Sequence, residues 1–202
     1  TITNSTISHN QSTGIYWVEN IIIENSDIIG NGIGSDNSLN GGGIKIAIDA
    51  TLNNVNIYNN RNNSYNGGGI YLYDDDSNID AGTVSLSNVS IHNNYAKKGG
   101  GLYIGGQGQF DLIFSDSAKC NIYENYATSG GTDIWLEYNE LTVILDTITV
   151  ATPTDYYAHP IGSITFEVEN HSVDPIVGDI YVDPSGSNDN SGTTSASPYK
   201  TI

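Results

Sequence analysis

Apolar and polar residues alternate in short runs along residues 1–150, and the phase of the alternation slips once within each run. Val84 and Leu86 share one face of a predicted strand, whereas Val89 and Ile91 share the next, because Leu86 and Val89 are separated by three positions instead of two. The same slip occurs at Ile2, Ser5 and Ile7, and at Leu52, Val55 and Ile57. A straight strand would turn its apolar groups outward after such a slip, so each run predicts two short strands joined by a bend.

An isoleucine and an asparagine recur after each bend as the element I-x-x-N. The isoleucines are Ile7, Ile28, Ile57, Ile91 and Ile122, and the asparagines are Asn10, Asn31, Asn60, Asn94 and Asn125. Asparagine tolerates the left-handed backbone conformation of a turn and can bond its own backbone. Stacked carboxamides can also donate hydrogen bonds from one repeat to the next. The sequence therefore predicts a structural ladder of asparagines rather than a catalytic set.

The position two residues before each isoleucine is small or apolar. It is occupied by Ser5, Ser26, Val55, Val89 and Cys120. Because side chains alternate across a strand, this position shares the inward face of the isoleucine. Cys120 is the only cysteine, so no disulfide framework is available. We expect it to pack as a small hydrophobic residue rather than to act as a reactive thiol.

A glycine-rich element opens a third strand in each repeat. Its apolar pairs are Ile15/Trp17, Ile44/Ile46, Ile70/Leu72, Leu102/Ile104 and Ile134/Leu136, and successive copies start 29, 26, 32 and 32 residues apart. Glycine permits positive φ and close backbone approach at a corner, whereas a phosphate-binding loop would need a following helix and a lysine at motif spacing. Three short strands and three turns per repeat predict an all-β fold, a right-handed parallel β-helix of about five to six coils.

Between the inward residues of this third strand, one outward position is mostly aromatic. It carries Tyr16, Lys45, Tyr71, Tyr103 and Trp135. Two interpretations stay open. The rings could brace the sheet by stacking on one another across strands. Alternatively, an exposed stripe of Tyr16, Tyr71, Tyr103 and Trp135 could form a contact surface for sugar rings or for a neighbouring chain.

The chain is strongly acidic, with six Lys plus Arg against 23 Asp plus Glu and a net charge of −17. Nucleic acid is therefore not expected as a partner, because phosphate binding depends on Lys and Arg. No apolar run approaches the ~20 residues that a transmembrane helix needs. These observations favour an extracellular or cell-surface protein without a transmembrane segment.

Calcium is the one cofactor that the acidic residues leave open. Two loops gather carboxylates among oxygen-rich neighbours, namely Asp74, Asp75, Asp76 and Asp80 in the first and Asp183 and Asp189 in the second. Neither loop has EF-hand spacing, and a solvated acidic loop is the alternative interpretation. The four histidines, His9, His92, His159 and His171, show neither a shared column nor metal-ligand spacing.

The alternation of I-x-x-N with GGGI or GGGL resembles the repeats of chlamydial polymorphic outer-membrane proteins and their bacterial surface relatives. Those repeats pair F-x-x-N with GGA-I, in right-handed parallel β-helices of the pectate-lyase-like superfold. Here Ile57, Ile91 and Ile122 replace the phenylalanine, and a third glycine replaces the alanine. The resemblance covers about residues 1–150 and implies a surface protein built on this superfold.

A second resemblance lies at the end of the chain. The segment 180–202, IYVDPSGSNDNSGTTSASPYKTI, is similar to the short motif that opens many secreted β-helix proteins. The expected organisation is therefore β-helix coils over 1–150, a break and terminal strand region over 151–175, and a start-like motif or linker over 176–202. Both ends read as mid-module, and we expect a stretch of a large surface protein.

The superfold includes polysaccharide lyases and hydrolases, so an enzyme has to be considered. The hydrolase signature, which combines N-T-D, D-D, G-H-G and R-I-K, is absent, and only six cations could serve as a lyase base. We therefore expect no catalytic residues and a non-catalytic structural or adhesive module. Its expected partners are other copies or modules of the same protein in head-to-tail filaments, and surface glycans. The alternative is an acidic-polysaccharide-binding or pectate-lyase-like domain.

Overall fold

The fold was analysed in a computed structural model that describes residues 1–34, 40–74, 82–106, 110–138, 140–174 and 178–201. Nearly all regular structure in these residues is β-strand. The strands are β1 (Ile2–Thr3), β2 (Thr6–Ser8), β3 (Ile15–Ile29), β4 (Ile44–Tyr58), β5 (Ile70–Asp74), β6 (Thr83–His92), β7 (Tyr95–Ala96), β8 (Leu102–Gly106), β9 (Asp111–Phe114), β10 (Cys120–Tyr123), β11 (Tyr126–Ala127), β12 (Ile134–Leu136), β13 (Leu141–Val150), β14 (Ala158–His159) and β15 (Ile164–Val173). The helical segment among them is a single 3₁₀ turn, η1 (Ile161–Ser163).

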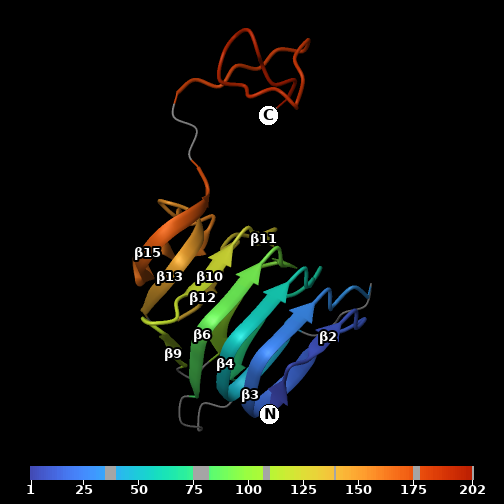
Figure 1. The fold of residues 1–202 in the computed structure, drawn as a ribbon, viewed down its shortest axis with the longest axis vertical. Helices are drawn as coiled ribbons and strands as arrows, with labels where there is room; N and C mark the ends of the chain where they lie inside the picture. The colour runs from blue at the N-terminus through green and yellow to red at the C-terminus, as the bar shows by residue number, and fades with distance from the viewer. Residues whose placement is uncertain (35–39, 75–81, 107–109, 139, 175–177, 202) are drawn as a thin grey trace.

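The strands stack in parallel, each on the strand one repeat further along the chain (Figure 1). One column of the register joins Ile15, Ile44, Ile70, Leu102, Ile134 and Ala158. It defines six coils: coil one (2–18), coil two (20–46), coil three (49–74), coil four (83–106), coil five (111–136) and coil six (141–159). Strand β15 then pairs with β13. The predicted all-β fold of stacked parallel coils is confirmed.

Coils one to four bend where the alternation of the sequence slips. In coil three the bend lies between the buried side chains of Leu52 and Val55, at Asn54, which has a φ of 54°. Asn25 and Asn88 occupy the same place in their coils with φ of 48° and 50°. A left-handed residue turns the strand and keeps the residues on both sides facing inward, and asparagine tolerates that conformation.

The space inside the coils is filled by columns of aliphatic side chains. Ile28, Ile57, Ile91 and Ile122 are each completely buried, and so is Cys120. The interior position predicted for Cys120 is therefore confirmed. The third strand departs from the prediction in coil one, because the register shifts after Ile15 and places Val18, rather than Trp17, beside Ile46.

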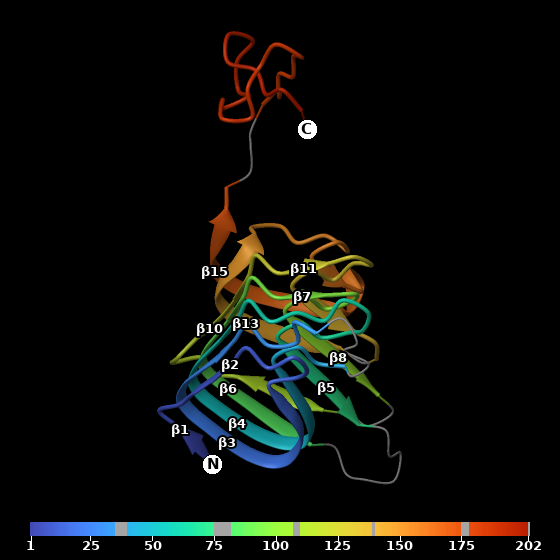
Figure 2. The same ribbon diagram turned by 90° about the vertical axis from the view of Figure 1, so that its right-hand side faces the viewer.

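The segment 178–201 lies apart from the stacked coils in both views (Figures 1 and 2). It forms no strand or helix, and a single parallel bridge joins Val182 to Tyr199. In the described part of the chain, no helix has the length and apolar character needed to cross a membrane.

Candidate functional site

The asparagine column is a continuous chain of side-chain hydrogen bonds through coils one to five. The Nδ2–Oδ1 distances are 2.8 Å from Asn10 to Asn31, 2.9 Å from Asn31 to Asn60, 3.0 Å from Asn60 to Asn94 and 3.1 Å from Asn94 to Asn125. The predicted ladder is therefore confirmed. Every amide donates toward the later coil, so the ladder has a fixed direction.

Both side-chain amide protons are used in the four ladder residues after Asn10, namely Asn31, Asn60, Asn94 and Asn125. Asn60, for example, donates its second proton to the backbone carbonyl of Ile28 over 2.8 Å. Its Oδ1 accepts from the backbone amide as well as the side chain of Asn31. Asn60 and Asn94 are each only 1% exposed. A buried polar group without partners is costly, so this complete pairing makes the buried column tolerable inside the fold.

The left-handed residue of each turn is not the ladder asparagine, as the sequence suggested, but the residue before it. These residues are His9, Gly30, Asn59, Asn93 and Glu124, with φ between 51° and 62°. The ladder residue itself is not among the residues with positive φ. Asparagine is therefore required in the ladder for its carboxamide and not for its backbone conformation. The left-handed position just before it is occupied by several residue types.

The last glycine of each GGG element borders the ladder. A Cβ on Gly101 would lie 2.7 Å from Nδ2 of Asn125 and 2.6 Å from the carbonyl oxygen of Asp133. Gly43 and Gly69 face the ladder asparagine of the next coil in the same way. The I-x-x-N element and the glycine element are thus coupled. The carboxamide of a ladder asparagine fits only if the coil before it has a glycine, with no side chain, at the facing position.

The ladder ends at Asp133, a residue that the sequence analysis did not select. Oδ1 of Asp133 accepts from Nδ2 of Asn125 over 3.1 Å and from its backbone amide over 3.3 Å. The side chain of Asp133 is completely buried, and its Oδ2 has no hydrogen-bond partner. Burial raises the pKa of this carboxyl to about 6, although Thr149 and Asn125 act in the opposite direction.

The aromatic column is present, but most of it is not an exposed stripe. Tyr71 and Tyr103 are only 3% and 2% exposed, so the outward exposure predicted for these two residues is wrong. Their rings stack on each other with centroids 4.9 Å apart and planes 12° apart. Tyr16, at 46% exposure, is the open end of the column. Stacking along the coils occupies the ring faces, which are the surfaces that a sugar ring would need.

Trp135, at the other end of the column, is half-buried, and its ring faces are covered as well. His159 of coil six stacks on its ring at 4.1 Å between centroids, and the Lys98 ammonium lies 4.2 Å from the ring centre. His159 therefore continues the aromatic column, which the sequence analysis missed. Within the column, the pKa of Tyr103 is raised by burial and by a hydrogen bond with Glu137.

Two further aromatic columns were not anticipated. His92 lies between the rings of Tyr58 and Tyr123, with centroid distances of 5.1 and 5.0 Å. On the turns after the ladder, Tyr95 stacks on Tyr126. The I-x-x-N register itself was the signal that could have found the first column, because Tyr58, His92 and Tyr123 each follow the ladder isoleucine directly.

The turns of coils three and four carry a local excess of positive charge. Residues 61–66 and 95–98, here called the turn edge, contain Arg61, Lys97 and Lys98 and no carboxylate. Strands β7 and β11 bury Ala96 and Ala127 and leave the alternate residues on the outside. The Arg61 guanidinium lies 4.4 Å from the ring centre of Tyr95. This edge is the cationic part of an otherwise acidic molecule.

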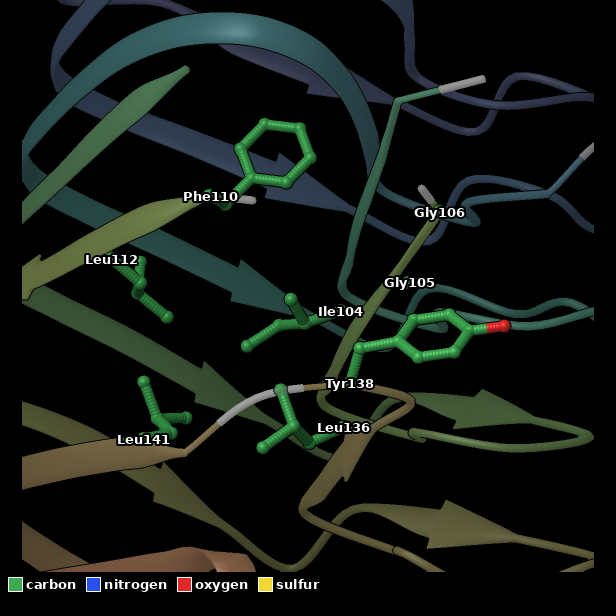
Figure 3. Close-up of a pocket in the computed structure, with 8 residues that line it drawn as sticks. All are labelled: Ile104, Gly105, Gly106, Phe110, Leu112, Leu136, Tyr138 and Leu141. Atoms are coloured by element: carbon green, nitrogen blue, oxygen red, sulfur yellow. The ribbon is translucent and has the colours of Figure 1, made fainter. Parts of the chain in front are cut away.

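The hollows on the described residues include three open ones and one small apolar cavity. The apolar cavity is lined mainly by aliphatic and aromatic side chains and measures about 20 Å³ (Figure 3). A volume of about 20 Å³ holds about one water molecule. The Tyr138 hydroxyl points away from the apolar side chains that line the cavity. The largest of the three open hollows, about 420 Å³, runs over coils two to four beside Asp49. Asp49 is engaged there, because its Oδ1 accepts from the backbone amide of Thr83.

The predicted calcium residues are only partly visible. Asp75, Asp76 and Asp80 lie outside the described residues, and of Asp74 the backbone alone is described, at the end of β5. Asp183 accepts from the hydroxyl and from the backbone amide of Ser185, and these two bonds lower the pKa of Asp183. Across the described ranges, no three His, Cys, Asp or Glu side chains gather as a metal site.

Comparison of this chain with protein-family models, curated proteins and solved structures finds no match.

Proposed function

We propose that this chain is a non-catalytic, extracellular structural or adhesive module, a right-handed parallel β-helix of a cell-surface protein. The observation that carries the proposal is the unbroken side-chain ladder from Asn10 to Asn125. In this fold the buried polar side chains hydrogen-bond one coil to the next. Such bonding suits a long and rigid stack of coils. Each coil buries its inner face only against its neighbours, as in other solenoids.

Head-to-tail assembly forms part of this proposal. The contact between coils supports it, because each described coil pairs with the next through parallel strands, and coils one to five also through the asparagine ladder. A coil of a second copy presents the same strand edges and carboxamides, and such edges favour the addition of a further parallel strand.

Sedimentation velocity and electron microscopy across a range of protein and calcium concentrations test the assembly. We expect growing linear species with the wild type and their loss in Ile7→Lys, which places a charge on the end of coil one. Ile22→Lys is the matched control, because Ile22 is already 44% exposed on the flank of coil two. Dispersed monomers of the wild type under every condition would exclude filament formation.

The second candidate function is contact with an acidic polysaccharide, and the turn edge is the observation that favours it. Arg61 and Lys97 are exposed there and have no ion pair among the described residues, whereas Lys119 is paired with Glu169 at 2.6 Å. Cations free of local carboxylates can bind the uronate groups of such a chain. The aromatic column supports this function only at Tyr16, where a ring is exposed.

A screen of uronate oligosaccharides tests this candidate. Arg61→Ala with Lys97→Ala should abolish binding, and Lys119→Ala should leave it unchanged. An ultraviolet assay for unsaturated products tests the lyase version of the same idea. Absence of both binding and product with the wild type would retire the alternative and leave the structural module as the proposal.

A further inference from the structure

The ladder stops at coil five, although coil six and then β15 continue the stack of parallel strands. Ile148 of coil six pairs with Ile122, so Ala151 occupies the place that corresponds to Asn125. Alanine can neither accept the last ladder protons nor fill the space of a carboxamide. The acceptor comes instead from Asp133, eight residues after Asn125 in the same coil.

Asp133 stands where coils one to four have a glycine. Ile134 pairs with Leu102, which places Asp133 directly over Gly101. A side chain is excluded at Gly101 by the carboxamide of Asn125 in the following coil. Coil six has no such carboxamide, so the aspartate side chain occupies the space that the missing asparagine leaves.

Coil six covers this carboxyl group. The Asp133 backbone amide donates to the carbonyl of Tyr157 over 2.9 Å, and the buried side chain of Thr149 lies on the same side. Thr149 is itself held by the backbone amide of Glu124, which donates to its hydroxyl oxygen over 2.6 Å. Oδ2 of Asp133 therefore lies between coils five and six without a hydrogen-bond partner.

No charged group compensates for this burial. The ionisable side chains on the surrounding elements are Tyr123, Glu124 and Tyr126 beside Asn125, and Asp146, Asp155, Tyr156, Tyr157 and His159 in coil six. Asp155 and His159 pair with each other at 3.1 Å near the surface. Desolvation dominates the pKa of Asp133, and no neighbouring charge contributes to it. Thr149 favours the charged form of this carboxyl through its hydroxyl and its backbone amide, but burial outweighs that effect. A buried carboxylate without a counter-charge is costly.

We propose that the docking of coil six onto coil five is proton-dependent, with Asp133 as the group that binds the proton. The protonated carboxyl still accepts the ladder bonds at Oδ1 and is neutral, so residues 141–159 pack tightly over it. The ionised carboxylate gains hydration only when coil six separates from it, so loss of the proton favours local opening of this coil. The contact between coils five and six would thus be closed in acid and looser at neutral pH.

The direction follows from the two pKa values. The carboxyl has a pKa of about 6 when buried and 3.8 as its ordinary value. The closed coil therefore binds the proton more tightly than the open one. The resulting stabilisation is complete below pH 3.8 and is lost as the pH rises through about 6. A difference of about two pKa units corresponds to a roughly 100-fold change in the opening equilibrium.

Amide hydrogen exchange over residues 141–159 tests the proposal, with rates corrected for the intrinsic effect of pH. In the wild type we expect the opening equilibrium to increase roughly 100-fold from acid to neutral pH. Asp133→Asn keeps an Oδ1 acceptor for Asn125 and cannot ionise, so its exchange should lack this increase. Asp111→Asn, which removes an exposed carboxyl of β9, should behave like the wild type. The same pH dependence in Asp133→Asn and wild type would overturn the proposal.

A direct titration covers the case in which Asp133→Asn does not fold. The side-chain carboxyl carbon of Asp133 can be followed by NMR in the wild-type chain. A midpoint near pH 6, shared with the amide signals of Thr149 and Tyr157, is the expected result. A midpoint at or below the ordinary value of 3.8 would overturn the proposal as well.

Discussion

Asn125 and Asp133 are joined twice, because the backbone and side-chain amides of Asn125 both donate to one carboxyl oxygen of Asp133. The other four steps of the ladder join asparagines of successive coils, whereas this step stays within one coil. A carboxylate accepts without donating, so it can end a column in which each member both accepts and donates. The ladder therefore has a defined end as well as a direction.

Removing a ladder carboxamide should destabilise the fold according to its burial. Asn94→Ala would leave the amides of Asn60 and the carbonyl of Ile57 without partners inside the coils. At ~1–3 kcal/mol for each buried unsatisfied group, we expect a loss of about 3 kcal/mol or more in the free energy of unfolding. Asn10→Ala, at the exposed end of the ladder, should cost less than about 1 kcal/mol. Urea titrations of both variants measure the difference, and equal losses would contradict the ladder as a source of stability.

The glycine that faces the ladder should not tolerate a side chain. In Gly101→Ala the new methyl group would meet Asn125 and the backbone of Asp133 at 2.6–2.7 Å, so we expect a loss of about 2 kcal/mol from overpacking. Gly162→Ala is the matched control, since no atom lies within 4 Å of the Cβ position at Gly162. Thermal and urea unfolding should show little change in that variant, and similar losses for both would argue against steric coupling at Gly101.

The Cys120 thiol should not react with alkylating reagents in the folded protein. Its side chain is completely buried, and burial raises the pKa of the thiol to about 11. Thiolate is the reactive form, so alkylation near neutral pH should require unfolding. Labelling as a function of urea concentration should follow the global unfolding curve. Cys120→Val should fold with nearly unchanged stability, because Val89 fills the neighbouring position in the coil before it; rapid labelling without urea would contradict the packing.

His92 should make the stability of the coils sensitive to acid. Burial lowers the pKa of His92 below its ordinary 6.5, and Glu124 opposes the shift only in part. The unfolded chain therefore binds the proton more readily, and stability declines as the pH falls below about 6.5. His92→Phe keeps a ring between Tyr58 and Tyr123 and removes the titration. The stability difference between wild type and variant should change as the pH falls below that value. Asp133 is present in both proteins, so its own pH dependence cancels in the difference. A difference in unfolding free energy that does not change with pH would count against this role of His92.

Much of the coil could be predicted from the alternation of residues. The three-position step from Leu52 to Val55 indicated a bend, and the shared spacing of I-x-x-N indicated stacked carboxamides. Both features are local consequences of side-chain direction, so they are visible in one repeat. The residue with the left-handed conformation was placed one position late, because the ladder asparagine and its neighbour Asn93 or Asn59 are the same residue type in two of the five turns.

The exposure of the aromatic column could not be predicted in the same way. Alternation correctly placed Tyr71 and Tyr103 between inward residues of their strands, but it gives no information on what covers the outer face. Ring–ring contact between coils leaves these side chains almost without solvent exposure. The solvent exposure of these rings is determined by the stacking distance and the order of the coils, which belong to the tertiary structure.

The sequence by itself determined that coils stack in parallel, which residues face inward, and where the asparagine ladder runs, because these properties repeat with the chain. The tertiary structure alone decided where the ladder ends. Asp133 lies eight residues after Asn125, and the space for its side chain exists because a different coil has Ala151 where an asparagine would be. The buried carboxyl without a counter-charge arises where the segments of Asn125, Asp133 and Ala151 meet. No single repeat of the sequence contains that information.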